Sequence, residues 1–267
     1  MMSKSIKGTA LVTGASSGIG ATYAKRLARR GYDLLLVARD QQRLDDLAKA
    51  LAQENGVRVE VLRADLTREA DLALIEQRLR DDEAISLLVN NAGIALNGTL
   101  AEADPAKVGA LINLNILALT RLSSVAAASF GAREQGAIVN VASVVALIPE
   151  MFNAVYSASK AYVLSLSQTM QSELGPRGVR VQAVLPGVTR TEIWERSGID
   201  EASLPVEMIM EVGDMVDAAL AGFDQGEVVT IPSLPDADDW ARFVGARAKL
   251  GPNLSHSRPA ERYRITG

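Results

Sequence analysis

The sequence of 267 residues contains no cysteine. Disulfides, thiolate nucleophiles and zinc or iron–sulfur sites that need thiolate ligands are therefore excluded, and a reducing compartment suits the chain. The only histidine, His256, lies in a proline-containing tail, far from the motifs described below. Neither a Ser/His/Asp triad nor a multi-histidine metal site can be built within one chain, so no metal is expected and acid/base chemistry must use another residue type.

Long runs of one charge and long apolar stretches are also lacking. The 28 Lys and Arg residues are interspersed with 32 Asp and Glu residues, which gives a formal net charge of −4 and argues against a nucleic-acid partner. The N-terminus lacks the apolar region and the cleavage site of a secretion signal, and no stretch approaches the roughly 20 apolar residues of a membrane span. We therefore expect a soluble cytoplasmic protein that binds neither nucleic acid nor a membrane.

Apolar side chains are plentiful, because 48% of the residues are hydrophobic and 22% are charged. Short apolar, β-branched runs alternate with longer segments of helical period, which is typical of βαβ units. The predicted strands are Thr9–Thr13, Asp33–Ala38, Val57–Leu62, Leu87–Asn90, Ala137–Val141, Val179–Leu185 and Val228–Ile231. The predicted helices are Ile19–Arg30, Gln41–Glu54, Glu69–Asp81, Pro105–Phe130, Asn153–Leu174 and Val212–Gly222. The pattern predicts an α/β fold, namely a doubly wound (Rossmann-like) parallel seven-stranded sheet with helices on both faces, which binds ligands at the carboxyl ends of its strands.

The alternation of strands and helices stops near residue 232. We expect a main domain over residues 1–232 and a C-terminal appendage over residues 233–267 that packs on the same domain and holds one short helix near residues 236–249. Within the main domain, residues 190–210 mix Gly198 and Pro205 with large apolar side chains. A movable substrate lid would require such a segment.

A glycine-rich turn, Thr13-Gly14-Ala15-Ser16-Ser17-Gly18-Ile19-Gly20, follows the first predicted strand, and a helix begins directly after it. Glycines let the backbone approach a pyrophosphate, whose charge the N–H groups and the positive end of the helix would meet. Tight strand–helix turns also use glycine without binding a ligand. The spacing G-x-x-x-G-x-G departs from the G-x-G-x-x-G of ordinary dinucleotide-binding dehydrogenases.

Tyr156 and Lys160 are four residues apart in a helical segment and therefore share one face of the helix. A nearby lysine ammonium favours the phenolate and is expected to lower the tyrosine pKa from its ordinary value of about 10. Taken alone, such a pair is usually surface packing. A chain with a single histidine nevertheless needs an acid/base device of this kind.

The glycine spacing, the turn Asn90-Asn91-Ala92-Gly93 and the segment Tyr156-Ser157-Ala158-Ser159-Lys160, in this order, resemble the short-chain dehydrogenase/reductase (SDR) family in its compact single-domain form. The resemblance covers roughly residues 7–232. It implies an NADP(H)-dependent oxidoreductase that transfers a hydride between its cofactor and a carbonyl or secondary alcohol, so that residues 1–232 form an NADP-binding catalytic domain. It also implies the catalytic residues Asn115, Ser143, Tyr156 and Lys160, with Asn113 as a rival for the role of Asn115.

The end of the second predicted strand bears on the choice between NADP and NAD. Ala38 stands where an NAD-preferring enzyme is expected to carry an acid for the ribose 2′-hydroxyl, and Arg39 follows it. Because arginine pairs with a 2′-phosphate, we expect NADP(H), whereas the adjoining Asp40 would either cap the next helix or weaken phosphate binding. The implied cofactor contacts are Gly14, Ser16, Ser17, Gly18, Ile19, Gly20, Arg39, Asp65, Leu66, Asn91, Ala92, Gly93, Tyr156, Lys160, Pro186, Gly187, Val188 and Thr191. Leu185 stands where the family commonly has Asn before the proline.

The substrate positions that the resemblance implies are nearly all apolar, although core packing explains each of them equally well. They are Ile94, Ser143, Val145, Met151 and Trp194. An apolar small-molecule carbonyl or alcohol is therefore the expected partner. Apolar side chains around much of the predicted helices 105–130 and 153–174 further predict a homodimer or homotetramer.

Two alternative functions remain open from the sequence: a catalytically silent NADP-binding regulatory protein and an NAD-dependent dehydrogenase. An epimerase or dehydratase of nucleotide sugars fits less well, because that branch of the family has a different glycine spacing and a larger C-terminal substrate domain.

Overall fold

The computed structural model describes residues 7–193 and 205–263 of the chain. The chain divides into two units, Met1–Pro232 and Ser233–Gly267, and each is described by itself.

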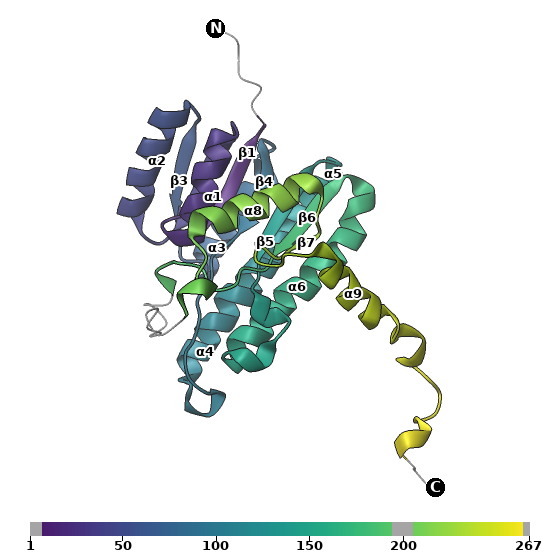
Figure 1. Cartoon of the computed structure of the whole chain (residues 1–267). Coiled ribbons are helices and arrows are strands. Elements are labelled where there is room, and N and C mark those ends of the chain that lie inside the picture. Colours follow the sequence, from purple (N-terminus) through teal and green to yellow (C-terminus); the bar gives the residue numbers. More distant parts are fainter. Residues whose placement is uncertain (1–6, 194–204, 264–267) are drawn as a thin grey trace. The chain divides into compact units, whose positions relative to one another are not determined.

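A parallel sheet of seven strands lies at the centre of the described part of the first unit (Figure 1). The strands are β1 (Thr9–Thr13), β2 (Asp33–Ala38), β3 (Val59–Arg63), β4 (Ile85–Asn90), β5 (Gly136–Val141), β6 (Val179–Val184) and β7 (Val229–Thr230). Their order is β3-β2-β1-β4-β5-β6-β7, and each neighbouring pair is parallel. The order reverses between β1 and β4, so the carboxyl ends of these two strands flank the crevice in which such sheets bind ligands. The predicted doubly wound fold is confirmed.

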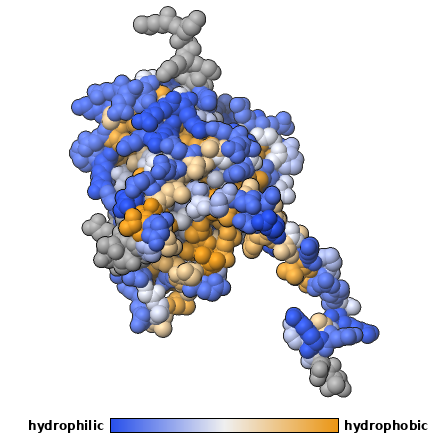
Figure 2. All heavy atoms as spheres, viewed as in Figure 1, coloured by the Kyte–Doolittle hydropathy of each residue, from blue (hydrophilic) through white to orange (hydrophobic). Residues whose placement is uncertain are grey.

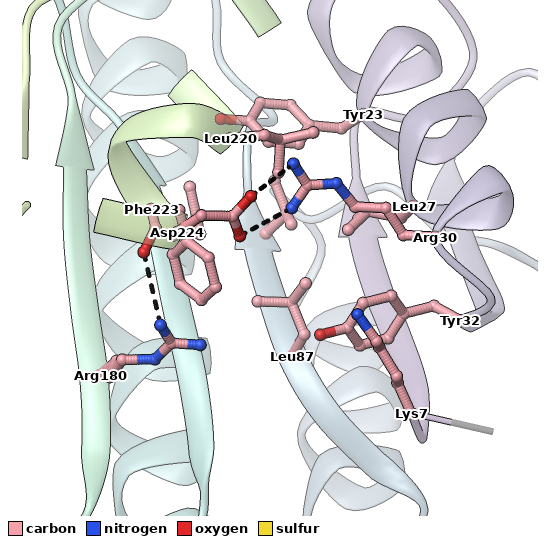
Figure 3. Close-up of a pocket in the computed structure, with 12 residues that line it drawn as sticks. Lys7, Tyr23, Leu27, Arg30, Tyr32, Leu87, Arg180, Leu220, Phe223 and Asp224 are labelled. Atoms are coloured by element: carbon pink, nitrogen blue, oxygen red, sulfur yellow. Dashed lines mark hydrogen bonds and ion pairs between the residues drawn. The ribbon is translucent and has the colours of Figure 1, made fainter. Parts of the chain in front are cut away.

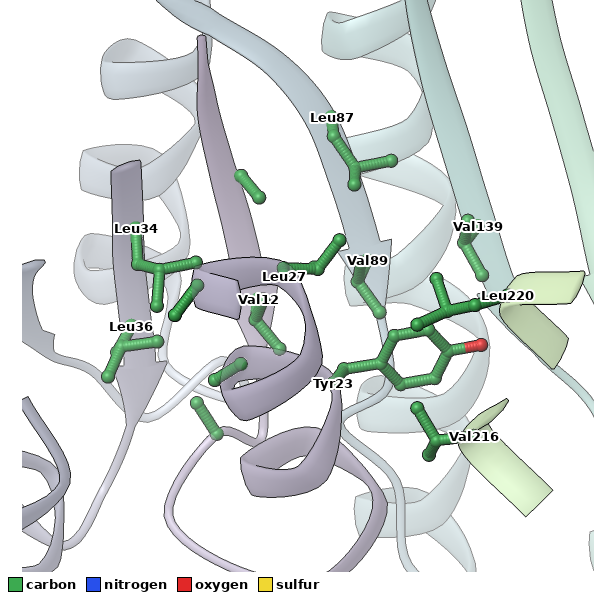
Figure 4. Packing of buried hydrophobic residues seen from close by; sticks show 14 of the residues in the cluster. Val12, Tyr23, Leu27, Leu34, Leu36, Leu87, Val89, Val139, Val216 and Leu220 are labelled. Atoms are coloured by element: carbon green, nitrogen blue, oxygen red, sulfur yellow. The ribbon is translucent and has the colours of Figure 1, made fainter. Parts of the chain in front are cut away.

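Helices cover both faces of this sheet. One face packs against α1 (Gly18–Arg29), α2 (Gln41–Asn55) and α8 (Val212–Gln225), and the other against α3 (Glu69–Asp81), α5 (Leu119–Ala132) and α6 (Ala154–Leu174). Because successive strand residues point to opposite faces, Val12 of β1 belongs to the first core and Leu11 to the second. Figure 4 shows the first core, where Tyr23 of α1 lies between the sheet and Leu220 of α8.

Local sequence signals explain where several helices begin. Asp40, Asp104 and Asn153 are the N-caps of α2, α4 (Pro105–Ile112) and α6, and their side chains accept hydrogen bonds from backbone N–H groups of the first turn. The bounds of β1, β2 and α3 are those predicted, and most other elements differ from their predicted ranges by a few residues at the ends.

The predicted helix over residues 105–130 is interrupted. It consists of α4, a π-helical turn at Asn113–Ala118 and α5, so the hydrogen-bond pattern changes around Asn115. A π-helical turn inserts one extra residue into the ladder, and such turns occur frequently at functional sites. The hydrophobic period alone does not predict this turn, because the apolar face continues through it.

The expectation about apolar stretches was wrong for this same segment. Pro105–Ala132, a helical segment of 28 residues that includes the π-helical turn, has a mean hydropathy of 1.4 over an 18-residue stretch and is long and apolar enough to cross a membrane by length and composition only. The prediction considered only runs of consecutive apolar residues. In this segment Asn, Ser and Thr are interspersed among apolar residues, and the mean hydropathy is high all the same. In the fold, Leu122 and Phe130 are buried against the sheet, and Arg121 pairs with Glu69 and Glu76 of α3. These contacts are those of a helix that covers the sheet.

A cavity lies between α1, α8 and the first face of the sheet (Figure 3). Across it, the Arg30 guanidinium of α1 donates to the Asp224 carboxylate of α8 at 3.0 and 2.9 Å. Lys7, Tyr32 and Arg180, which line it, stand at or just before the starts of β1, β2 and β6. The cavity therefore lies toward the amino ends of the strands and does not belong to the site expected at their carboxyl ends.

The second unit holds α9 (Ala237–Ala248), which lies within the predicted range of 236–249. Asp236 caps this helix, and the rings of Trp240 and Phe243 stack with their centroids 5.4 Å apart. No residue of this unit is buried within 233–263, the part that the structure describes. The described part of this unit therefore has no buried core of its own.

Candidate active site

The glycine turn between β1 and α1 forms a tight backbone cradle. Gly14 and Gly18 have positive φ angles of 65° and 52°, which side chains rarely adopt. A Cβ atom at Gly20 would lie 2.3 Å from the Gly14 carbonyl oxygen. Ser17, the N-cap of α1, makes no side-chain capping bond, so its hydroxyl does not occupy the first N–H groups of the helix. A cradle with backbone donors at a helix N-terminus fits the pyrophosphate of a dinucleotide.

Asn91 joins this turn to the end of β4. Its side-chain Nδ2 donates to the Thr13 carbonyl at 2.9 Å and to the Gly14 carbonyl at 3.3 Å. The Thr13 hydroxyl in turn accepts from the backbone N–H groups of Asn91 and Ala92 at 3.0 and 3.1 Å. The Asn91 side chain therefore holds the turn in shape, whereas Ala92 and Gly93 continue along the crevice at half-buried positions.

The ends of β2 and β3 bring together the residues expected at the adenosine end of a cofactor. Arg39 is exposed, and Asp40 caps α2 by accepting from the Arg43 N–H at 3.0 Å. Burial acts to raise the pKa of the Asp65 carboxyl, but hydrogen bonds from Thr67 and the positive charge of Arg39 outweigh it, so the pKa is lowered. Arg39 and Asp65 therefore lie close enough to interact, and Asp40 has the capping role that was one of its two predicted roles.

The segment Pro186–Thr191 after β6 faces the glycine turn. A Cβ atom at Gly18 would lie 3.2 Å from the Thr191 methyl group, so this threonine adjoins the phosphate cradle. Thr189 forms an isolated bridge with Met210, which brings the two ends of the predicted lid together at its base. Trp194 and the rest of residues 194–204 lie outside the described residues.

Tyr156 and Lys160 stand on the first turns of α6, at the carboxyl end of β5. Lys160 is buried, 6% exposed, and its Nζ donates to the Val141 carbonyl at 2.9 Å. The same Nζ lies 5.6 Å from the centroid of the half-buried Tyr156 ring. The Ser143 hydroxyl, on the loop after β5, is a hydrogen-bond partner of the Tyr156 phenol.

The expectation that Lys160 lowers the pKa of Tyr156 was wrong. Burial raises the pKa of Tyr156 to about 12, and its hydrogen bond with Ser143 offsets this only in part. Burial also lowers the pKa of Lys160 to about 8. Desolvation is therefore the largest cause of both shifts. As a result, Tyr156 keeps its proton at neutral pH and is suited to donate it.

The fourth predicted catalytic residue, Asn115, lies in the π-helical turn and is buried, whereas its rival Asn113 is exposed. Its side chain accepts from the Ile94 N–H and donates to the Ile94 carbonyl, each at 2.9 Å. It also donates to the Ser159 hydroxyl of α6 at 3.3 Å. The structure thus brings Ser143, Tyr156 and Lys160 together and links Asn115 to α6, the helix that carries Tyr156 and Lys160.

The predicted apolar substrate residues within the described part of the chain differ in burial. Ile94 and Val145 are half-buried, whereas Met151 is exposed. The ring of Phe152 packs edge-on against Tyr156, with a centroid distance of 5.3 Å and an interplanar angle of 70°. An apolar ligand beside Tyr156 would meet the ring of Phe152.

Sequence reasoning assigned no role to Asn153. As the N-cap of α6, its Oδ1 accepts from the N–H groups of Val155 and Tyr156 at 3.0 and 3.1 Å. Its Nδ2 donates to the Gly98 carbonyl at 2.7 Å, which ties the loop after β4 to the helix of Tyr156. An asparagine directly before an apolar helical run is an N-cap signal, so the capping role was readable from the sequence. The bond to Gly98 was not, because it depends on the tertiary fold.

Comparison with known proteins agrees with this geometry. Residues 8–202 match the family model for short chain dehydrogenases. The chain is 32% identical over 223 residues to an uncharacterized oxidoreductase of Staphylococcus saprophyticus, with 83% of this chain and 93% of that protein covered. It is 30% identical over 270 residues to the NADPH-dependent 1-acyldihydroxyacetone phosphate reductase of Schizosaccharomyces pombe, with 91% and 88% covered.

Two solved structures are similar over nearly the whole chain. One is a short-chain dehydrogenase from Sphingobium yanoikuyae in complex with NADPH, 54% identical, with a TM-score of 0.93 and with 96% of this chain and all (100%) of that one covered. The other is the bulky-bulky ketone specific alcohol dehydrogenase from Comamonas testosteroni, 47% identical, with a TM-score of 0.88 and coverage of 96% and 98%. Together with the glycine cradle and the group formed by Ser143, Tyr156 and Lys160, these similarities show that the chain belongs to the short-chain dehydrogenase/reductase family.

Proposed function

We propose that this chain is an NADPH-dependent oxidoreductase that interconverts bulky, apolar ketones and their secondary alcohols. The observation that carries the proposal is the geometry at the carboxyl end of β5, where the Tyr156 phenol is a hydrogen-bond partner of Ser143 and its ring lies 5.6 Å from the buried Lys160 Nζ. Such a group can bind a carbonyl oxygen and deliver a proton to it.

NADPH supplies the hydride that reduces the carbonyl carbon when it is bound. The cradle of Gly14, Gly18 and Gly20 would hold its pyrophosphate. Arg39 is exposed and would hold the 2′-phosphate of the cofactor, and the preceding residue, Ala38, carries no charge that would repel this phosphate. The solved relative from Sphingobium yanoikuyae is a complex with NADPH, and the relative from Schizosaccharomyces pombe is NADPH-dependent, which supports the same cofactor here.

The residues of this chain then have distinct roles in reduction. Ser143 and Tyr156 donate hydrogen bonds to the carbonyl oxygen, and Tyr156 gives up its proton as negative charge grows there. The Lys160 ammonium, with its pKa lowered to about 8 by burial, is still mostly protonated at pH 7 and returns a proton to the phenolate. Asn115 holds the backbone of Ile94 beside the reacting group.

The preference for bulky ketones rests on the apolar walls and on one relative. Phe152 packs against Tyr156, Ile94 and Val145 are half-buried apolar residues, and the relative from Comamonas testosteroni is specific for bulky-bulky ketones. In this proposal residues 190–210 form the lid of the site and Trp194 contacts the substrate. The packing of the appendage 233–267 on the catalytic domain and a cytoplasmic location stay predictions.

The silent regulatory protein is the less favoured alternative, because Ser143, Tyr156 and Lys160 are all in place. The NAD-dependent dehydrogenase is tested by the cofactor experiment below.

The proposal is tested by following NADPH absorbance with purified protein and a series of ketones, from acetone to a ketone with an aromatic ring on each side of the carbonyl. We expect kcat/KM to rise with the size of both substituents, because each buried methylene adds about 0.8 kcal/mol of apolar transfer energy. The absence of NADPH consumption with every ketone, and of NADP+ reduction with the matching alcohols, would contradict the proposal.

Arg39→Ala tests the cofactor assignment. We expect the Kd of NADPH to rise about 10- to 100-fold, because charge-assisted hydrogen bonds are worth about 1.5–3 kcal/mol, while the Kd of NADH changes little. Arg68→Ala is the matched control, because Arg68 is also exposed and also lowers the pKa of Asp65. Equal loss of NADPH affinity in both variants, or tighter binding of NADH by the unaltered protein, would show that Arg39 does not select NADP.

The protein is further proposed to be a homodimer or homotetramer. Figure 2 shows apolar atoms on the surface over the region where α6 lies in Figure 1. Ile112 and Leu117, in the helical segment 105–132, are 42% and 47% exposed, and Tyr162 of α6 is 38% exposed. A face of this kind is suited to burial between copies of the chain.

Light scattering at micromolar concentration measures this state directly, and we expect a mass two or four times that of the 28.4 kDa chain. Leu117→Glu should shift the mass toward the monomer, because it places a charge in the buried centre of an interface. A monomeric unaltered protein would contradict this part of the proposal.

A further inference from the structure

Every hydrogen-bonding group of the Asn115 side chain is occupied. Its Oδ1 accepts from the Ile94 N–H, and its two Nδ2 hydrogens go to the Ile94 carbonyl at 2.9 Å and to the Ser159 hydroxyl at 3.3 Å. A primary amide has two N–H donors, so none is left for a substrate. Space is also limited, because a Cβ atom at Gly93 would lie 3.2 Å from the Asn115 Oδ1. Asn115 therefore acts through its position.

Ser159 connects this side chain to the catalytic helix. Its hydroxyl donates to the Tyr156 carbonyl at 2.7 Å, one turn earlier in α6, and accepts from Asn115 with a remaining lone pair. Ser159 is fully buried and directly precedes Lys160. One hydroxyl group thus joins the π-helical turn, the backbone of Tyr156 and, through Asn115, the backbone of Ile94.

Ser157 provides a contrast on the same helix. It is as buried as Ser159, at 0% exposed, and it is also within one residue of a member of the Tyr156/Lys160 pair. Its Oγ, however, has no hydrogen-bond partner among the described residues. The two serines are therefore similar in burial and in their position on α6. They differ in the hydrogen bonds that their hydroxyl groups make.

We infer that Ser159 is a positioning residue for the proposed ketone reduction: it fixes the Asn115 amide, and through it the Ile94 wall, relative to Tyr156 and Lys160. The expected effect on kcat rests on the proposed function. The expected effect on the positions of Asn115 and Ile94 rests on the hydrogen bonds alone. Without Ser159, one Nδ2 hydrogen of Asn115 is left buried and unpaired, which favours a different side-chain orientation. The Ile94 N–H then loses its acceptor.

Ser159→Ala and Ser157→Ala form the matched pair of variants, because each removes one buried hydroxyl from α6. We expect kcat for ketone reduction to fall about three- to tenfold in Ser159→Ala, with KM and the Kd of NADPH within about twofold of the unaltered protein. Ser157→Ala should keep kcat within about twofold, because its hydroxyl has no partner to lose. Each kcat is normalised to the fraction of protein that binds NADPH in a titration, so a structural defect alone would lower the melting temperature and the binding fraction of Ser159→Ala and leave the normalised kcat unchanged.

Hydrogen exchange of the peptide segment that contains Ile94 provides a readout that does not depend on turnover. We expect faster exchange of the Ile94 amide in Ser159→Ala and unchanged exchange in Ser157→Ala. If no ketone is turned over by the unaltered protein, the proposed function fails while this exchange comparison still tests the link through Ser159. Unchanged exchange at Ile94 in Ser159→Ala, or equal kinetic effects in the two variants, would overturn the inference.

Discussion

The burial of one amine, that of Lys160, is the constraint on which the proposed site depends. A lysine that is 6% exposed loses most of its hydration, and the hydrogen bond of its Nζ to the Val141 carbonyl at 2.9 Å replaces only part of it. The pKa of the amine consequently falls to about 8, while burial raises that of the neighbouring Tyr156 to about 12. Both groups then carry protons at neutral pH, so the pair is prepared to give a proton to a substrate oxygen and to replace it.

The fold keeps this pair in place by anchoring the start of α6 from several sides. Val141 ends β5, a central strand whose neighbours β4 and β6 are both parallel to it, so the acceptor of Lys160 lies on a rigid element. Asn153 caps α6 and holds the loop after β4, and Ser159 ties α6 to the π-helical turn. The glycine cradle at the end of β1 lies beside the end of β4 through Asn91. The parallel sheet therefore brings cofactor cradle and proton donor to one edge, as the switch in strand order requires.

Much of this was readable from the sequence. Alternation of β-branched runs with helical segments predicted seven strands in a parallel sheet. A fully buried strand such as β2 appears in the sequence as a continuous apolar run. Glycine spacing predicted the tight backbone turn, and the i,i+4 spacing predicted that Tyr156 and Lys160 share one face of α6, because these features are local in the chain. Their roles toward a cofactor and a substrate stay predictions. The π-helical turn at Asn115 was not predicted, because its apolar face has the same period as an ordinary helix.

The direction of the Tyr156 pKa shift, the bond of Asn153 to Gly98 and the contacts of Ser159 could not be predicted from the sequence. A pKa reflects burial by residues that are distant in the chain, and burial is the largest cause of the raised pKa of Tyr156. The bonds of Asn153 to Gly98 and of Asn115 to Ser159 span 55 and 44 residues. Spacing along the chain carries no information on such contacts, so only the fold reveals them.

The most direct test of the account is the turnover of Tyr156→Phe, measured beside its NADPH affinity. The variant keeps the ring that packs against Phe152 and loses only the hydroxyl, so we predict that kcat for ketone reduction falls by about 10²- to 10⁴-fold while the Kd of NADPH changes little. Tyr162→Phe on the same helix is the control, because its hydroxyl pairs with Thr120 at 2.9 Å on the surface, and it should keep full activity. A Tyr156→Phe protein that reduced the same ketone at the rate of the unaltered chain would contradict the account.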